Sequence, residues 1–177
     1  MGIQIGAKPD SGFDDPIGML KDCHRRIEHF LGILCVVVER AKGRSLSGEE
    51  AAAIQAALHY FRVGGQRHNA DEEQSLFPRM RQQCAPEELS EIGALEHDHR
   101  HADQLHTQAE SLYSAWISDG SLSRADEEAL LTAASQLKQL YEAHIKTEEQ
   151  IVFPRASKSL NPEDLAAIGQ EFKHRRA

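Results

Sequence analysis

The sequence predicts an all-α protein, folded as an antiparallel up-down four-helix bundle with a short C-terminal helix. Apolar residues recur at alternating spacings of three and four in each long segment, which is the pattern of a helix with one buried face. Runs that alternate with a period of two between turn residues are scarce, so strands are not expected. Four helical segments of roughly 25–35 residues joined by short loops favour antiparallel neighbours.

Turn and capping residues delimit the first two long helices. Pro16 stands at a helix start, behind a stretch rich in Gly, Asp and Ser, because proline is favoured in the first turn of a helix. Residues 42–50 break this helix. Within that break, Ser47 followed by Glu50 predicts a capping box for the second helix.

Similar signals delimit the remaining helices. Pro86 is expected in the first turn of the third helix, and residues 118–129 separate this helix from the fourth. Ser123 and Asp126 within the break form a second predicted cap. A short final helix is expected to begin at Pro162.

Length and composition limit the class of protein. The chain of 177 residues is long enough to bury a core, and one domain is expected, with the bundle over about residues 16–158. A net charge of −8 argues against nucleic-acid and anionic-membrane surfaces as partners. No signal peptide or membrane-spanning run is recognised. Three cysteines without CxxC spacing fit reduced thiols, so a cytoplasmic location is expected.

An internal repeat divides the chain into two helical hairpins. HNADEEQSLFPRM at 68–80 and HIKTEEQIVFPRA at 144–156 share His, Glu-Glu, Gln, Phe-Pro and Arg in the same order, 76 residues apart. HRRIEHFL at 24–31 matches HRHADQLH at 99–106 at an offset of 75. We call residues related by these offsets repeat partners. The nearly constant offset predicts an approximate internal two-fold axis.

Each long helix carries a histidine in the middle of its apolar face. In the second and fourth helices a glutamate follows that histidine after four residues, which places both side chains on one face, about 6 Å apart along the axis. The predicted inward faces of the four helices are Ile17, Leu20, His24, Ile27, Leu31, Leu34 and Val38; Ile54, Leu58, Phe61, Gly65, His68, Glu72 and Leu76; Ile92, Leu95, His99, Ala102, His106 and Ala109; and Leu130, Leu137, Tyr141, His144, Glu148 and Ile151.

Imidazoles and carboxylates on an apolar face need a partner. Each loses hydration worth several kcal/mol unless it is paired or bound to a cation, and no Lys or Arg occupies these faces. Nitrogen and oxygen donors at one level of a bundle form a ligand set for a metal. The sequence therefore predicts a metal site inside the bundle. Glu73 and Glu149 lie roughly 140° around the helix from their histidines and are expected at the bundle edge or in solvent.

These residues resemble the hemerythrin-like, HHE cation-binding domain. The resemblance rests on HRRIE, HNADEEQSLFP, DHR and HIKTEEQIVFP and covers roughly residues 16–158. It implies a bundle holding two non-haem iron ions in an oxo- or hydroxo-bridged di-iron centre, with the motif histidines as terminal ligands and the motif glutamates as bridges. Transferred residue by residue, the implied metal ligands are His24, His68, Glu72, His99, His144 and Glu148.

The third helix departs from the oxygen-carrying members of this family, which use two histidines there, four residues apart. His97 and His101 have that spacing but lie off the apolar face, so His99 is preferred and the other two are expected to be exposed. Their entry into the metal coordination stays open. His106 lies on the apolar face, too far along the helix to share the iron of His99, and is expected as a hydrogen-bonded core residue or as part of the pocket lining.

Other residues near the predicted site have open roles. Glu28 and Asp103 each follow a ligand histidine by four residues, and are expected at the surface or as acceptors for the imidazoles, with metal coordination as an alternative. Tyr141 is expected in the core with its hydroxyl toward the rim, although a hydrogen bond into the site is an alternative. Gly64 and Gly65 leave room for a neighbouring helix, a large side chain or a ligand channel.

Three functions are compatible with such a centre. The resemblance implies binding of O2, NO or a related small oxidant such as peroxide. Four histidines and two carboxylates leave more open metal positions than five histidines do, so redox catalysis is an alternative: peroxide decomposition, NO reduction or iron oxidation. An iron-responsive interaction module is a third reading. Whether the protein is an enzyme stays open, and the expected partner is a small molecule rather than a nucleic acid or a membrane.

Overall fold

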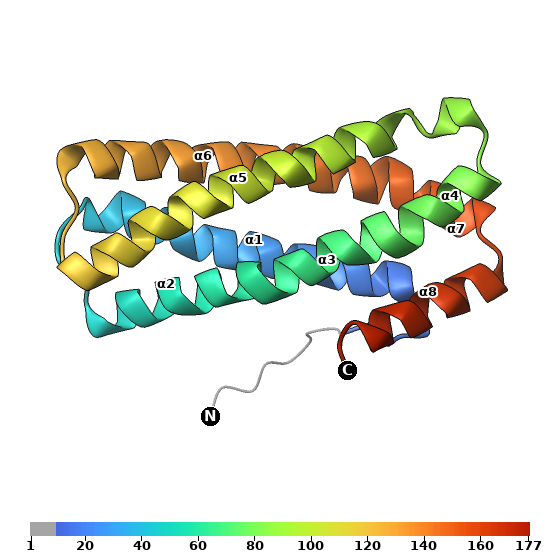
Figure 1. Ribbon diagram of the computed structural model, residues 1–177, viewed down its shortest axis with the longest axis horizontal. Coiled ribbons are helices and arrows are strands. Elements are labelled where there is room, and N and C mark those ends of the chain that lie inside the picture. Colours follow the sequence, from blue (N-terminus) through green and yellow to red (C-terminus); the bar gives the residue numbers. More distant parts are fainter. Residues whose placement is uncertain (1–9) are drawn as a thin grey trace.

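The computed structural model describes residues 10–177, which form an all-helical bundle without strands in this part of the chain (Figure 1). Three π-helical segments, Phe61–Gly65, Glu72–Leu76 and Glu148–Val152, interrupt the longer helices, and a 3-10 turn spans Pro86–Glu88. Within residues 10–177, no helix combines the length and the apolar character that crossing a bilayer requires. The α-helices are α1 (Pro16–Ala41), α2 (Gly48–Tyr60), α3 (Gln66–Asp71), α4 (Phe77–Gln83), α5 (Ser90–Asp119), α6 (Arg124–Thr147), α7 (Phe153–Ser159) and α8 (Pro162–His174).

The helices α2, α3 and α4 follow one another along a single rod, and α6 continues into α7 in a second one (Figure 1). We call these the α2–α4 rod and the α6–α7 rod. Each rod follows one long helix in the chain, α1 or α5, as the internal repeat predicts. The packing contacts between α5 and α6, between α1 and α6 and between α1 and α2 hold the bundle together.

Most predicted capping residues act as expected. Ser47 and Glu50 make both bonds of the capping box ahead of α2. The Ser123 hydroxyl accepts the backbone N–H of Asp126 ahead of α6. Pro86 was expected in the first turn of the third helix, but it lies in the separate 3-10 turn, and α5 begins behind it.

Two π-helical segments precede the repeated Phe-Pro pairs. The backbone N–H of Phe77 donates to the carbonyl of Glu72, five residues earlier, and that of Phe153 donates to Glu148. A proline inside an α-helix loses one hydrogen bond and clashes with the carbonyl four residues before it. The wider turn accommodates the following proline, so each rod continues through its Phe-Pro pair instead of ending there.

The π turn also changes which residues face the core. Ile151 was predicted on the inward face, but it is 39% exposed, whereas Val152 is fully buried. Each π turn contains one residue more than the three-and-four pattern of an α-helix allows, so the inward position after Glu148 moves by one residue. The prediction for Ile151 was therefore wrong because it extended the α-helical period across a π-helical segment.

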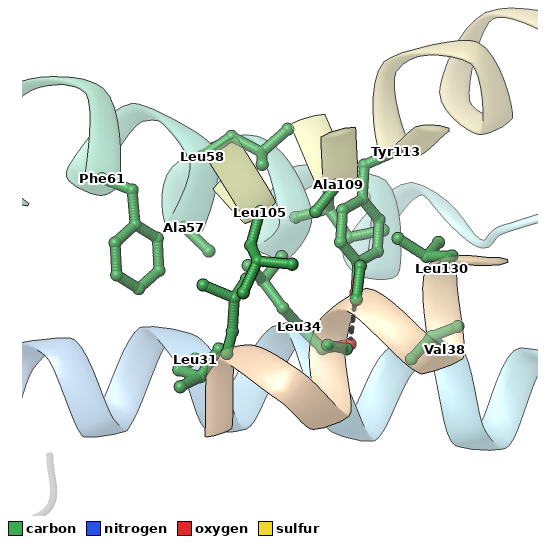
Figure 2. Packing of buried hydrophobic residues seen from close by; sticks show 14 of the residues in the cluster. Leu31, Leu34, Val38, Ala57, Leu58, Phe61, Leu105, Ala109, Tyr113 and Leu130 are labelled. Carbon is green, nitrogen blue, oxygen red and sulfur yellow. Dashed lines mark hydrogen bonds between the residues drawn. The ribbon is translucent and has the colours of Figure 1, made fainter. Parts of the chain in front are cut away.

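Two apolar clusters fill the bundle. The larger one, partly shown in Figure 2, lies between α1, α2, α5 and α6 and includes Tyr113, whose hydroxyl donates to the carbonyl of Leu34 at 2.8 Å. The smaller one gathers Phe77, Phe153 and Phe172 at the other end. The inward histidines and glutamates occupy the layer between these clusters, because they lie between members of the two clusters along each helix.

The C-terminal helix α8 packs against α1 and α3 and adds Phe172 to the smaller cluster. Behind it, Arg175 and Arg176 each pair with the carboxylate of Asp71, at 2.8 and 2.6 Å. Asp71 is fully buried and directly precedes Glu72. The end of the chain is thus tied to the segment that carries an inward glutamate.

Candidate metal centre

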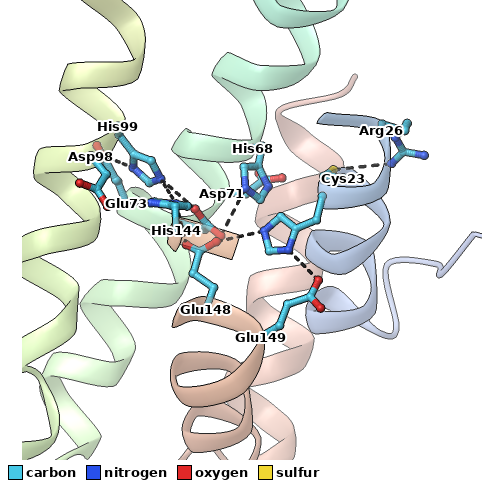
Figure 3. A network of polar contacts seen from close by, with 12 residues as sticks. Cys23, Arg26, His68, Asp71, Glu73, Asp98, His99, His144, Glu148 and Glu149 are labelled. Carbon is cyan, nitrogen blue, oxygen red and sulfur yellow. Dashed lines mark hydrogen bonds and ion pairs between the residues drawn. The ribbon is translucent and has the colours of Figure 1, made fainter. Parts of the chain in front are cut away.

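The six predicted ligands lie together in one buried layer. His24 comes from α1, His68 and Glu72 from the α2–α4 rod, His99 from α5, and His144 and Glu148 from the α6–α7 rod. Each of the six residues is at most 4% exposed. Figure 3 shows His68, His99, His144 and Glu148 converging on one region of the bundle.

The donors form two groups that share both glutamates. The first group contains His24 and His68, the second contains His99 and His144, and Glu72 and Glu148 belong to both. Within each group, every residue offers one donor atom within 4.8 Å of the others. The arrangement follows the internal repeat, because His24 and His68 are the repeat partners of His99 and His144.

Each glutamate offers one carboxylate oxygen to each group. Oε2 of Glu148 lies 3.0 Å from Nε2 of His24, and its Oε1 lies 3.1 Å from Nε2 of His144. Oε1 of Glu72 lies 3.5 Å from Nε2 of His68, and its Oε2 lies 3.3 Å from Nε2 of His99. A carboxylate that presents its two oxygens to two different groups has the geometry of a bridge between two cations.

Several of these buried donor atoms lie 3.0–3.5 Å from one another but make no hydrogen bond of favourable geometry among the described residues. They are Nε2 of His24, both ring nitrogens of His68, and both oxygens of Glu72 and of Glu148. Buried polar atoms without a partner are costly and rare, so such a concentration calls for a bound ion. Nε2 of His99 and Nε2 of His144 also face each other at 3.2 Å, the separation expected of two imidazoles that bind one ion at about 2.1 Å. The donor set therefore fits metal ions.

The ionisation of the buried glutamates also indicates a site that suits bound cations. Burial and the neighbouring Glu148 raise the pKa of Glu72 well above its ordinary value. Burial opposes ionisation of Glu148 as well, but His144 and His24 hold its pKa well below the ordinary value. Without a cation, burial and mutual repulsion thus oppose the simultaneous ionisation of both carboxylates. Divalent cations would allow both to be ionised.

The histidines respond to the same environment. Burial lowers the pKa of His68 well below its ordinary value. Burial also acts against protonation of His24 and His144, yet the nearby carboxylates, Glu148 above all, raise the pKa of both. Metal binding would displace these protons, because imidazole binds a metal in its neutral form.

Glu73 and Glu149 lie at the bundle edge, as expected, but they also contact the site. Oε1 of Glu149 lies 2.8 Å from Nδ1 of His24, and Oε1 of Glu73 lies 2.7 Å from Nδ1 of His99. A carboxylate on the far nitrogen fixes the orientation and tautomer of a ligand imidazole. Sequence reasoning missed this role, although the duplication of the Glu-Glu pair in both halves was a signal for it.

The phenylalanines of the repeated Phe-Pro pairs pack on histidines of the donor layer that come from the opposite half. The ring of Phe153 stacks on His24 with a centroid distance of 5.4 Å, and that of Phe77 stacks on His99 at 6.4 Å. Both phenylalanines are fully buried. Each repeated motif thus supplies a donor pair, a hydrogen-bond acceptor and an apolar cover.

The two halves of the bundle differ in whether a carboxylate accepts a hydrogen bond from Nδ1 of the second histidine. Oδ2 of Asp98 lies 3.4 Å from Nδ1 of His144, whereas Nδ1 of His68 has no hydrogen-bond partner among the described residues. The repeat partner of Asp98 is Cys23, a buried thiol that contacts Arg26 instead.

The remaining candidates lie outside the layer. His97 and His101 are exposed and belong to neither donor group. Glu28 is exposed, and Asp103 accepts a hydrogen bond from Gln66. Among the described residues, neither carboxylate makes a hydrogen bond or ion pair with an imidazole of the donor layer.

Tyr141 and His106 lie one layer further along the bundle. The Tyr141 hydroxyl lies 3.0 Å from Nε2 of His106, a half-buried histidine that lines the same cavity. Sequence reasoning did not predict this partner, because His106 comes from another helix, α5. His106 has both expected features: it is hydrogen-bonded, and it lines a cavity.

Comparison with known families gives one match. Residues 15–156 match the family described as Hemerythrin HHE cation binding domain. This range contains all six donors and both acceptor glutamates. A comparison with curated proteins gave no match.

Proposed function

Because the chain belongs to the hemerythrin HHE cation-binding family, we propose that its six buried donors hold two iron ions and that this di-iron centre binds O2, NO or peroxide. Cation binding is the property of the family. The number of ions, their identity and the small ligand are our proposal. The observation that supports it most strongly is that two donor groups share both carboxylates.

In this proposal His24 and His68 are the terminal ligands of one iron, and His99 and His144 are those of the other. Glu72 and Glu148 bridge the two ions. Each iron then has about four protein donors, fewer than the roughly six that octahedral iron accepts, and the remaining positions are available to water or to a small ligand.

The proposal includes the arrangement of the bundle. We infer that α1, the α2–α4 rod, α5 and the α6–α7 rod run alternately up and down as an antiparallel four-helix bundle. The support comes from the contacts between successive helices and from the donor layer, in which each helix or rod contributes one histidine.

The surroundings of the layer suit this chemistry. Apolar clusters on both sides exclude water, so electrostatic interactions between the donors and a cation are stronger than in solution. Bound iron would supply the electrons and the open positions. The residues of the chain orient the imidazoles through Glu73 and Glu149, and the stacked phenylalanines cover two of the rings.

Anaerobic loading with Fe(II), followed by metal analysis and absorption spectra before and after O2, tests the proposal. We expect about two irons per chain and charge-transfer absorption in the near ultraviolet after oxidation. Zinc alone after purification from iron-rich medium, or a single iron per chain after loading, would contradict it. Peroxide added to the loaded protein then distinguishes stable binding from turnover.

A further inference from the structure

The two halves of the bundle present equivalent grooves of similar volume above the donor layer. One cavity of about 250 Å³ lies between the α2–α4 rod and α5, and one of about 270 Å³ lies between the α6–α7 rod and α1. Their linings correspond through the repeat: Asp103 and Glu28, His106 and Leu31, and Thr107 and Gly32 are repeat partners. Volume does not distinguish the two cavities, so any difference in role comes from the side chains.

Two substitutions between repeat partners set the cavities apart. Gly65 in the α2–α4 rod stands where the α6–α7 rod has Tyr141, and His106 stands where α1 has Leu31. The glycine leaves space on its side of the bundle, where a Cβ atom would meet only Phe61, at 3.6 Å. The Tyr141 hydroxyl bonds to His106 across the bundle, and both residues line the first cavity. Tyr141 lines the second cavity as well, so Gly65 and His106 are the residues that distinguish the first one.

The pair lines this cavity at the level of the bundle next to the donor layer. Tyr141 precedes His144 by one helical turn on the same buried face, and Gly65 precedes His68 in the same way. Burial raises the pKa of Tyr141 far above its ordinary value, and Asp103, Tyr60, Glu148 and Glu72 raise it further. The hydroxyl therefore keeps its proton while lying within electrostatic range of both bridging carboxylates.

The first cavity is equipped for a hydrogen-bonding molecule. Burial lowers the pKa of His106 to about 4, so the imidazole is neutral, and the neutral ring and the phenol can each donate or accept a hydrogen bond. The charged groups of the lining have partners, since Gln66 donates to Asp103 and Arg62 lies 3.4 Å from Glu110. The equivalent cavity has Leu31 in place of the histidine.

We propose that the cavity beside Gly65 is the route by which a small hydrogen-bonding ligand, such as peroxide or azide, reaches the metal centre, and that Tyr141 and His106 are positioning residues that hold it by hydrogen bonds at the inner end. This inference rests on the proposed di-iron centre. It adds a route and two residues that differ between the halves of the repeat.

Stopped-flow binding of azide to the iron-loaded protein tests the route, with a matched pair of glycine variants. Gly65→Leu fills the first cavity, and we expect the azide association rate to fall at least tenfold at unchanged iron content. Gly32→Leu places the same side chain at the wall of the equivalent cavity, where a Cβ atom meets nothing within 4 Å, and should leave the rate unchanged. Equal rates in both variants, or slowing by Gly32→Leu alone, would overturn the proposal.

Tyr141→Phe and His106→Leu test the hydrogen bonds without adding bulk. Each should weaken azide binding about fivefold, the factor that corresponds to one lost hydrogen bond, and the double variant should lose little more than either single one. Tyr113→Phe is the control, because it also removes a buried hydroxyl hydrogen bond, but in the larger cluster, bonded to Leu34. Unchanged azide affinity in both test variants overturns the role of the pair.

These tests separate the two proposals. If the wild-type protein does not load about two irons per chain, the di-iron centre fails and the route fails with it. If it loads two irons but binds no azide, the route alone is wrong. If the wild-type protein binds azide but the Gly65, Tyr141 and His106 variants bind it equally fast and tightly, only the route is wrong. If Gly65→Leu does not retain iron, the Tyr141 and His106 variants decide the question.

Discussion

Nδ1 of His24 lies 2.8 Å from Oε1 of Glu149, a residue 125 positions later in the chain. The same contact recurs between His99 and Glu73 at 2.7 Å. In each Glu-Glu pair, the first carboxylate enters the donor layer and the second orients a histidine from the opposite half of the bundle. The two halves therefore complete each other's sites.

Removing the orienting carboxylates should weaken metal binding without abolishing it. In Glu149→Ala and Glu73→Ala the imidazole loses its fixed orientation, and we expect iron affinity to fall about 10- to 100-fold, as for other partners of metal-bound histidines. Competition with a chelator measures the affinity. Glu128→Ala, an exposed glutamate of α6, is the control, and an affinity equal to this control would contradict the role assigned here.

The six side chains that the sequence places on apolar faces do lie together in one buried layer, because their spacing of three and four puts them on the inward side of each helix. Their role as metal ligands stays a prediction. The sequence did not predict the contacts of Glu73 and Glu149. These glutamates point away from their own histidines, and their partners lie on another helix, which a pattern within one helix does not reveal. The prediction that Ile151 faces inward was wrong for a different reason, since the π-helical segment locally changes the spacing of inward-facing residues.

The C-terminal arginines should contribute strongly to stability. Asp71 is fully buried, and Arg175 and Arg176 neutralise it, so their joint replacement by Ala leaves a buried charge without a partner. We expect a loss of about 3–5 kcal/mol in the free energy of unfolding, measured with urea. Adding Asp71→Asn to the double variant should restore part of the loss. A double variant as stable as the wild type would show that the ion pairs contribute little.

Removal of the metal should lower the melting temperature. The buried donors then lack a cation, whereas bound ions stabilise the folded state by an amount that grows with the logarithm of their affinity. Calorimetry of the iron-loaded and the chelator-treated protein provides the measurement. Identical melting temperatures would mean that ion binding is not coupled to the folded bundle.

Acid should destabilise the protein through His106. The pKa of His106 is about 4 in the folded protein, below the ordinary value of 6.5. Its contribution to the free energy of unfolding is therefore fully present above pH 6.5 and is lost as the pH falls toward 4. Over that window, the metal-free wild type should lose about 3 kcal/mol more than His106→Leu, which has no proton to gain. Urea unfolding at several pH values measures the stability of both proteins, and parallel pH profiles would contradict a neutral, half-buried His106.

The most direct test of the shared-carboxylate centre is the iron content of two neighbouring variants, Glu148→Ala and Glu149→Ala, loaded at saturating Fe(II). Glu148 offers one oxygen to each donor group, so its removal should affect both ions together, and iron should fall from about two per chain to near zero. Glu149→Ala should retain about two irons per chain at saturation. Retention of both irons by Glu148→Ala, or their loss from Glu149→Ala alone, would show that the carboxylate at 148 is not the bridge.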